Sequence, residues 1–400
     1  MPSLGHGQPR IFYIKFESPQ DTRLTPPSYQ GIRYNTGFIG FRRFSITYFR
    51  LHPMSPLFDQ NSLLSAEAAD TASHHLADVL RHAFGHSDQA AVVVYDQRCP
   101  LTITLAESYR RQLPAAQFID FDQTPPQTIL DSFASLQVGD LVVLIQSTNF
   151  RLEAYRLRVE LFKRGLKVVE HPHLIRMPGV EGLIYIDSLA YDPVYFRETG
   201  RKLQAAIAVA EYTEIDSGNG SKLRFNGRLE PARLNVGDYS GMNNVGGQFP
   251  IGEVFTESVR LEDVSGEVNV FIFGDTRFLI NRPAQPITLI VEAGQVTGAR
   301  HSTPEFDQVL ANIRADDGVV WVRELGFGLN RAFSRERTVT DIGTYERMCG
   351  IHLSLGSKHG SYAKPHIKRG EGRHHIDVFA VTEGVNIGGQ QVYRNGTWVV

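Results

Sequence analysis

Short runs of apolar residues alternate with longer stretches in which apolar residues recur at helical spacing, beginning near residue 61. A run of about four to eight apolar residues is typical of a buried strand, whereas recurrence every three or four residues is typical of an amphipathic helix. The pattern predicts helices over residues 66–84, 101–113, 128–136 and 151–165. It predicts strands over residues 91–96, 117–122, 140–147 and 166–171. Buried strands that alternate with helices indicate a parallel sheet covered by helices.

Beyond this region a helix is expected over residues 193–210 and a hairpin around residues 216–221. After residue 235, strands and glycine-rich turns predominate. The expected elements there are strands over residues 268–273, 286–294 and 319–325, a short helix over 304–314, and a terminal hairpin over 385–400 with Asn395-Gly396 as its turn. We therefore predict an α/β N-terminal domain with a mostly parallel sheet over residues 61–235, followed by an α+β domain over residues 236–400.

The first 60 residues form an arm of different composition. Residues 31–50 are rich in glycine, arginine and aromatic side chains. Arginine and aromatic residues are enriched at interfaces, so one interpretation is an arm that binds an anion or a partner. The other interpretation, which we favour, is a pair of edge strands packed on the body of the protein.

Composition excludes several classes of protein. The chain has 400 residues, of which 42% are apolar, and its 41 basic residues nearly balance its 43 acidic ones. The overall charge therefore favours neither nucleic acid nor a membrane surface, and we find no apolar run long enough to span a bilayer. Two isolated cysteines provide no disulfide framework, which agrees with a cytoplasmic setting. No glycine-rich nucleotide-binding loop follows the first strand.

Histidines are concentrated near the C-terminus. Five of the fourteen lie between positions 352 and 375, and Asp377 follows them. Residues two apart in a strand point the same way, so His375 and Asp377 can face one metal ion while Ile376 enters the core. Neutral imidazole and carboxylate groups are ligands of divalent metals. A polar edge strand beside a basic loop is the alternative interpretation of the same residues.

Two glutamates stand out in apolar surroundings. Glu253 follows a glycine-rich stretch, and Glu324 lies inside an apolar run. A buried carboxylate needs a partner charge or a metal ion. Glu324 has Arg331 as a possible ion-pair partner, whereas Arg323, its neighbour in the strand, points to the opposite face. For Glu253 the alternative is a cap of a helix or turn.

The order of these motifs resembles the thermophilic metallo-aminopeptidase family typified by aminopeptidase T. That family has a Pro-x-Gly-Glu-Val-Phe motif, then a metal-binding glutamate that opens Glu-x-x-x-Gly, then His-x-x-Leu-Gly after a glutamate turn, and finally His-x-Asp. The matching segments of this chain are Pro250 to Phe255, Glu324 to Gly328, Tyr345-Glu346 with His352 to Gly356, and His375 with Asp377. The resemblance implies that the C-terminal domain binds metal.

In that family two divalent metal ions share six ligands, one of which is a tyrosine seven residues after the first histidine. The implied ligands here are Glu253, Glu324, His352, His375 and Asp377, with Glu253 and Glu324 also as catalytic candidates. The sixth position departs from the family because His359 occupies it and Tyr362 lies three residues on. Either His359 binds the metal, or Tyr362 reaches it after a shift of the loop. A nitrogen ligand would favour zinc, cobalt or iron.

The resemblance implies a hydrolase that cleaves an amide or peptide bond with a two-metal site. The same scaffold includes the 2,5-dihydroxypyridine dioxygenases, which use one ferrous ion, so an Fe(II) ring-cleaving dioxygenase is the alternative. A binding protein without catalytic activity is the third. We favour hydrolysis because the chain keeps every carboxylate of the two-metal pattern.

The expected partners are a small-molecule or short-peptide substrate, including anionic ones, and a second copy of the chain, since relatives in the family are dimers. We expect no binding to nucleic acid or to a membrane.

The loop from Lys358 to His375 carries five basic residues and one acidic residue. It is either an electropositive rim that attracts anionic substrates or a solvated surface loop, and we favour the second.

Overall fold

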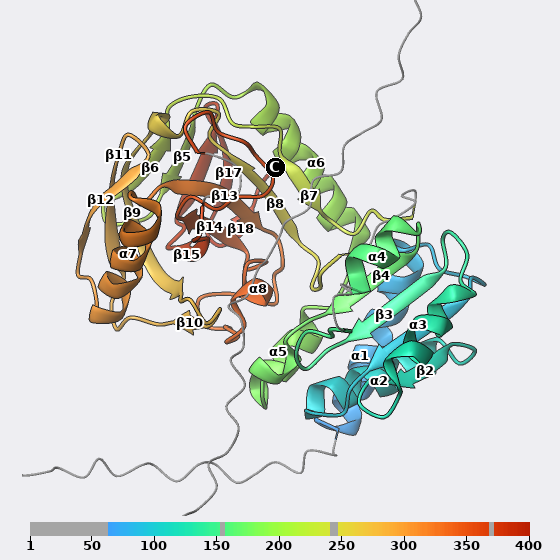
Figure 1. The fold of residues 1–400 in the computed structure, drawn as a ribbon. Helices are drawn as coiled ribbons and strands as arrows, with labels where there is room; N and C mark the ends of the chain where they lie inside the picture. The colour runs from blue at the N-terminus through green and yellow to red at the C-terminus, as the bar shows by residue number, and fades with distance from the viewer. Residues whose placement is uncertain (1–62, 153–156, 241–246, 368–371) are drawn as a thin grey trace, which may run out of the picture. The chain divides into compact units, whose positions relative to one another are not determined.

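The computed structural model describes residues 63–152, 157–240, 247–367 and 372–400 (Figure 1). All of these belong to one compact unit, residues 60–400. The arm expected over residues 1–60 lies outside the described residues.

The N-terminal part is a parallel sheet with helices on both faces, as the sequence predicts. Its strands lie in the order β2-β1-β3-β4, and every pair is parallel. The strands are β1 (Ala91–Tyr95), β2 (Gln117–Asp120), β3 (Leu141–Ile145) and β4 (Lys167–His171). The helices are α1 (Ala66–Asp78), α2 (Pro100–Gln112), α3 (Pro126–Ala134) and α4 (Leu157–Lys163), and α1 continues as a π-helical segment, Val79–Ala83.

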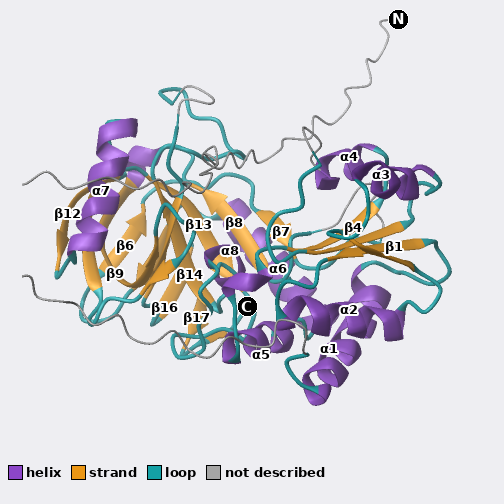
Figure 2. Ribbon diagram, turned by 60° about the horizontal axis from the view of Figure 1, so that its bottom comes forward, coloured by secondary structure: helices purple, strands orange, loops and turns teal. Residues whose placement is uncertain are grey.

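Alternation along the strands explains this layering. In β1, Val93 packs in the core that α1 and α2 close, whereas Val92 and Val94 pack in the core that α3 and α4 close. Figure 2 shows the two pairs of helices on opposite faces of the sheet. All five residues of β3 are buried, which fits a central strand covered on both sides. The helix expected over residues 151–165 is described only as α4, since residues 153–156 lie outside the described chain.

Two helices then lead to the second sheet. They are α5 (Val180–Asp187), which the sequence pattern did not predict, and α6 (Pro193–Val209), which it did. Asp192 caps α6 because its side chain accepts hydrogen bonds from the first backbone N–H groups of the helix. The expected hairpin follows as β5 (Thr213–Asp216) and β6 (Lys222–Phe225).

The C-terminal part is a large antiparallel sheet of 14 strands that curls on itself, accompanied by two helices (Figure 1). Its main path runs β18-β17-β16-β5-β6-β9-β15-β14-β13-β8-β7. The strands not yet bounded are β7 (Arg233–Asn235), β8 (Glu253–Glu257), β9 (Val264–Gly274), β10 (Ile280–Asn281), β11 (Ile287–Glu292), β12 (Gln295–Arg300), β13 (Val322–Gly328), β14 (Gly350–Leu355), β15 (Ile376–Ala380), β16 (Gly384–Ile387), β17 (Gln390–Arg394) and β18 (Thr397–Trp398). The helices are α7 (Pro304–Asp317) and α8 (Ile342–Tyr345).

The sheet refines three details of the predicted pattern. The strand expected over residues 319–325 is β13, displaced toward the C-terminus. Asn395-Gly396 forms the expected turn, but it joins β17 to β18, while Gly388-Gly389 joins β16 to β17. The hairpin β5–β6 precedes residue 235 and is part of the large sheet, and the domain boundary itself stays a prediction.

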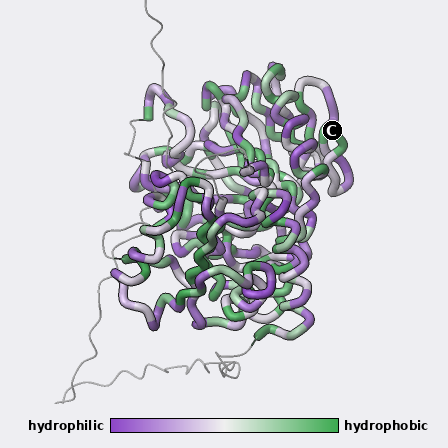
Figure 3. Tube along the Cα trace, turned by 90° about the vertical axis from the view of Figure 1, so that its right-hand side faces the viewer, coloured by the Kyte–Doolittle hydropathy of each residue, from purple (hydrophilic) through white to green (hydrophobic). Residues whose placement is uncertain are grey.

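Hydrophobic and hydrophilic stretches alternate along the trace (Figure 3). Within the described residues, no helix has the length and apolar character needed to cross a membrane.

Candidate metal centre

A cluster of carboxylates and imidazoles lies on one face of four adjacent strands, β8, β13, β14 and β15. Side chains two apart in a strand share a face, so Glu253 and Glu257 lie on the same side of β8. Glu324 of β13 is directly opposite Glu257, and Asp377 of β15 is directly opposite Ser354 of β14. The strand register therefore brings together residues from distant parts of the sequence.

Three side chains converge at the centre of the cluster. Nε2 of His352 lies 3.4 Å from Oε1 of Glu253 and 3.3 Å from Oε1 of Glu324. One donor atom from each residue lies within 4.8 Å of the other two, and all three residues are buried. This buried Glu-Glu-His triad can hold a metal ion, and its oxygen and nitrogen donors suit zinc, cobalt or iron.

The position of His352 depends on a glycine in the adjacent strand. Gly326 of β13 is directly opposite His352. A Cβ atom at position 326 would lie 2.0 Å from the imidazole ring, far inside van der Waals contact. The missing side chain therefore provides the space in which His352 approaches the glutamates.

His359 enters the cluster from the loop after β14. Its Nε2 lies 3.4 Å from Oε2 of Glu324, and 3% of its side chain is exposed. Within the described chain neither ring nitrogen has a hydrogen-bond partner. Burial lowers the pKa of His359 to about 2, so the ring is neutral and has a free lone pair. The Tyr362 hydroxyl instead donates to the carbonyl of Pro231 at 2.9 Å, so the geometry favours His359 for the sixth ligand position.

His375 and Asp377 share a face, as the sequence predicts. Nε2 of His375 lies 3.1 Å from Oδ1 of Asp377, and Ile376 between them is buried in the core. The ring of His375 is 5.8 Å from that of His359. Although the ion pair is close, Oδ1 of Asp377 has no well-directed hydrogen bond from any described group. These two residues thus extend the cluster away from the Glu-Glu-His triad.

The remaining two histidines of the C-terminal group lie outside the cluster. His374 pairs with Asp316 at 2.7 Å. His366 packs on the ring of Trp321, with 5.1 Å between centroids. The histidine-rich sequence therefore supplies three imidazoles to the site.

The structure adds two residues that sequence analysis did not assign to the site, Glu346 and Arg347. Arg347 contacts Glu346 and lies 3.4 Å from Oε2 of Glu253. Burial raises the pKa of Glu346 well above its ordinary value, and the charges of Asp377 and Glu253 raise it further. Burial also acts to raise the pKa of Glu253, but Arg347 and then His352 hold it below its usual range. The family's glutamate turn was the available signal for Glu346.

The acidic side chains of the cluster outnumber its one arginine. They are those of Glu253, Glu324, Glu346 and Asp377, and Arg347 lies beside the first and third. Burial alone would lower the pKa values of His352 and His375, but the neighbouring carboxylates raise both to about 10. These carboxylates stabilise positive charge. When no cation is bound, protons on His352 and His375 supply that charge. The donor set therefore fits a divalent metal.

A buried ion network holds the loop that carries His359. Arg323 pairs with Glu257, the two side chains being 2% and 0% exposed, and it also donates to the carbonyls of Ser357 and Tyr362. Lys364 donates to Glu230 at 2.9 Å and lies 3.8 Å from Glu257. The network connects β8 and β13 to both ends of the segment from Ser357 to Lys364.

Three expectations about this region are corrected. Lys364 belongs neither to an electropositive rim nor to a solvated surface, because 1% of its side chain is exposed. Lys368, Arg369 and Glu371 lie outside the described residues. The alternative ion pairs of Glu324 are also wrong, because Arg323 pairs with Glu257 and Arg331 lies 3.9 Å from Asp192. Glu253 is no cap but the first residue of β8.

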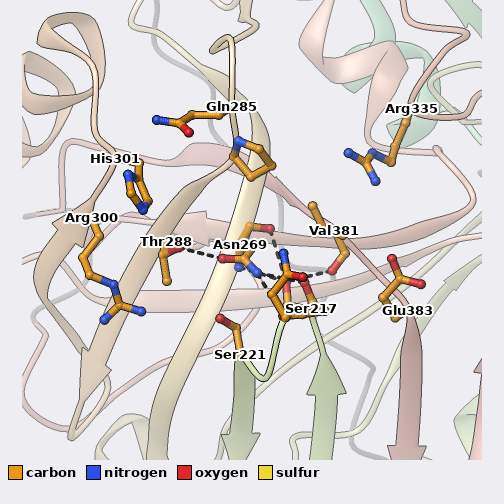
Figure 4. A pocket seen from close by; sticks show the side chains of 13 residues that line it. Ser217, Ser221, Asn269, Gln285, Thr288, Arg300, His301, Arg335, Val381 and Glu383 are labelled. Atoms are coloured by element: carbon orange, nitrogen blue, oxygen red, sulfur yellow. Dashed lines mark hydrogen bonds between the residues drawn. The ribbon is translucent and has the colours of Figure 1, made fainter.

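A cavity of about 620 Å³ opens elsewhere on the large sheet (Figure 4). Buried polar side chains on its floor bond to one another and to the backbone. Thr288 donates to Asn269 at 2.7 Å, and Asn269 donates to the carbonyl of Ser217 at 2.9 Å. Its lining comes mainly from the β5–β6 turn, β9, β11 and the segment after β15. The metal-binding candidates lie outside this lining.

No known protein family matches the sequence, and no curated protein matches it either. Solved structures do match the fold. A 2,5-dihydroxypyridine dioxygenase from Pseudomonas putida KT2440 superposes with a TM-score of 0.56 at 16% identity, covering 84% of this chain and 97% of its own. Wild-type AmpT from Thermus thermophilus superposes with a TM-score of 0.51 at 13% identity, covering 83% of this chain and 99% of its own. The chain thus shares its fold, over more than four fifths of its length, with AmpT and with a 2,5-dihydroxypyridine dioxygenase.

Proposed function

We propose that the protein is a metal-dependent hydrolase that cleaves an amide or peptide bond with two divalent ions. One observation carries the proposal: the buried ring of His359 lies 3.4 Å from Oε2 of Glu324, and neither of its nitrogens has a hydrogen-bond partner among the described residues. A core histidine of purely structural role normally finds such partners. An imidazole held neutral beside Glu324 is instead suited to bind a cation.

The ligands divide into two groups that share Glu324. His352 contacts Glu253 and one oxygen of Glu324, and His359 contacts the other oxygen of Glu324. The ring of His375, which pairs with Asp377, lies 5.8 Å from that of His359. Shared carboxylates are suited to two neighbouring metal ions. When bound, such ions polarise a carbonyl group and lower the pKa of water.

We assign proton transfer to Glu346 rather than to Glu253 or Glu324. The last two converge on His352 and serve as ligands in this proposal. Glu346 lies near Asp377 and is held by Arg347, so its carboxylate is positioned without being one of the converging donors. A carboxylate in this position can accept a proton from attacking water and return it to the leaving amine.

Hydrolysis of leucine p-nitroanilide tests the proposal. Protein stripped with a chelator should be inactive and should recover activity with zinc, cobalt or manganese. The variant Glu346→Gln should keep its metal content, measured by mass spectrometry, and lose turnover. Failure of every divalent metal to support hydrolysis of this substrate and of short peptides would remove the hydrolase assignment.

An Fe(II) dioxygenase is the second candidate, and one observation favours it. Two of the three histidines of the cluster, His352 and His375, together with Asp377 make up the two-histidine, one-carboxylate set typical of non-haem iron oxygenases. That assignment leaves Glu253, Glu324 and His359 without a role, which is why we place it second. Oxygen uptake with 2,5-dihydroxypyridine, together with one iron per chain, would favour the dioxygenase.

A further inference from the structure

A cross-strand row connects the metal cluster to the edge strand β7. Arg233 of β7 is directly opposite Phe255 of β8, which is opposite Gly326 of β13, which is opposite His352 of β14. Directly opposed residues of an antiparallel sheet lie on the same face. Arg233 and Phe255 therefore lie on the face that carries the cluster.

Phe255 forms an aromatic wall beside the cluster. It lies between Glu253 and Glu257 on the same face of β8 and is only partly buried. Its ring centroid is 6.2 Å from that of His359 and 6.5 Å from that of Tyr362, both edge-on. The rings of His359 and Tyr362 stack at 5.3 Å. Phe255 and Tyr362 thus place two aromatic rings against His359, beside the candidate ligands.

Arg233 carries an uncompensated charge at the end of this wall. Its guanidinium lies 5.5 Å from the centroid of the Tyr362 ring, interacts with the hydroxyl of that tyrosine, and donates a long hydrogen bond, 3.4 Å, to the carbonyl of Ser361. It forms no ion pair with any carboxylate in the described part of the chain. Arginine is well suited to recognise a carboxylate, because its N–H groups match that shape.

We propose that Arg233 and Phe255 form a subsite that binds the carboxylate and the apolar side chain of a short substrate, a dipeptide or an N-acyl amino acid. This inference rests on the proposed hydrolase function and specifies its substrate. Only β8 separates β7 from β13, so about 10 Å of sheet lies between the backbone of Arg233 and the strand of Glu324. Because the arginine side chain covers part of this distance, the remaining separation between its guanidinium and the strand of Glu324 is about the length of one or two extended residues. A dipeptide or an N-acyl amino acid has that length.

The test compares L-leucyl-L-phenylalanine with its C-terminal amide, which lacks the negative charge. Metal-loaded wild-type protein should hydrolyse the free dipeptide with a kcat/KM about 10- to 100-fold higher, the range expected for a charge-assisted hydrogen-bonded pair. Arg233→Met should abolish that preference, bringing kcat/KM for the free dipeptide down to the value for the amide. Arg224→Met is the matched control, because Arg224 also lies over a tyrosine ring, 4.2 Å from that of Tyr212, but on β6.

Equal rates on both probes in the wild type, or a preference that survives in Arg233→Met, would overturn the subsite. If the wild type hydrolyses neither probe, the hydrolase assignment fails, and calorimetry with the same two probes on zinc-loaded protein decides the subsite separately. Tighter binding of the free dipeptide that Arg233→Met removes supports it. Equal affinities, or binding of neither probe, count against it.

Discussion

Two histidines, one at the end of a strand of the parallel sheet and one in a loop beside the large sheet, have almost no exposed side chain and differ in one respect. His171 at the end of β4 is 0% exposed, and both ring nitrogens are satisfied, by the hydroxyls of Tyr109 at 2.8 Å and Tyr185 at 2.7 Å. The side chain of His359, in the loop after β14, is 3% exposed, but neither of its ring nitrogens forms a hydrogen bond with a described group. Burial lowers the pKa of both rings, to about 3 and about 2 respectively.

Burial and a shifted pKa therefore do not by themselves identify a site. His171 is a core histidine whose hydrogen bonds lie within the fold. His359 lies beside the carboxylate of Glu324, and neither of its ring nitrogens forms a hydrogen bond with a described group. A candidate cation site differs from an ordinary core because it contains buried nitrogen or oxygen atoms without hydrogen-bond partners, close to a carboxylate.

Replacing Glu324 should have the largest effect on this comparison. Glu324→Gln removes the carboxylate that contacts both His352 and His359. Metal content should fall. Turnover should fall by more than about 100-fold, since removing a residue that merely supports a metal ligand typically costs about 10- to 100-fold. Mass spectrometry and peptide hydrolysis measure the two effects. Glu267→Gln is the control, since Glu267 pairs with Arg300 at the surface of the same sheet.

His359→Ala and Tyr362→Phe decide the sixth ligand. The alanine variant should lose metal occupancy and turnover, because it removes a neutral imidazole from the cluster. The phenylalanine variant should retain its metal, since the Tyr362 hydroxyl bonds to the carbonyl of Pro231. The reverse outcome, in which only Tyr362→Phe loses metal, would show that the tyrosine moves into the site.

Lys364→Met probes the network behind His359. The substitution removes a buried positive charge that neutralises the carboxylates of Glu257 and Glu230. The free energy of unfolding should therefore fall by about 3–5 kcal/mol. Chemical denaturation with a two-state fit measures the change. Lys222→Met is the comparison, because Lys222 pairs with Glu214 in solvent, where losing the pair should destabilise the fold far less. Equal losses in the two variants would show that the network does not stabilise the fold.

The smallest expected effect concerns His171 and acid. Its pKa is about 3 in the fold and 6.5 in the unfolded chain, so the unfolded state binds the proton first as pH falls. Stability is thus fully present above pH 6.5 and declines as pH falls toward 3, by about 2 kcal/mol between pH 7 and pH 5. His171→Gln, which has no titrating group, should show a correspondingly shallower decline. If the free energy of unfolding falls by the same amount between pH 7 and pH 5 in the wild type and in His171→Gln, the explanation is wrong.

The parallel sheet was predictable because its strands are apolar on both faces and its helices have clear amphipathic spacing. The C-terminal sheet was harder because one face of β8 carries Glu253, Phe255 and Glu257, so the strand lacks an alternating apolar pattern. Motif order identified Glu253, Glu324 and His352 as one group, and the fold brings them together.

The rest of the site depends on contacts that sequence spacing does not encode. Arg347 reaches Glu253 from the turn after α8, and Lys364 folds back onto β8. Both side chains looked like ordinary charges in the sequence. Their partners come from strands about 100 residues away in the chain, and register rather than local pattern sets such pairs.

The central claim is that this face of the second sheet holds two divalent ions. Anomalous X-ray diffraction from crystals of protein purified without chelator and loaded with zinc tests it most directly. The account predicts two anomalous peaks, one near Glu253, Glu324 and His352 and the other near His359, His375 and Asp377, with Glu324 between them. A map with no peak at these side chains, while zinc binds elsewhere, would contradict the account.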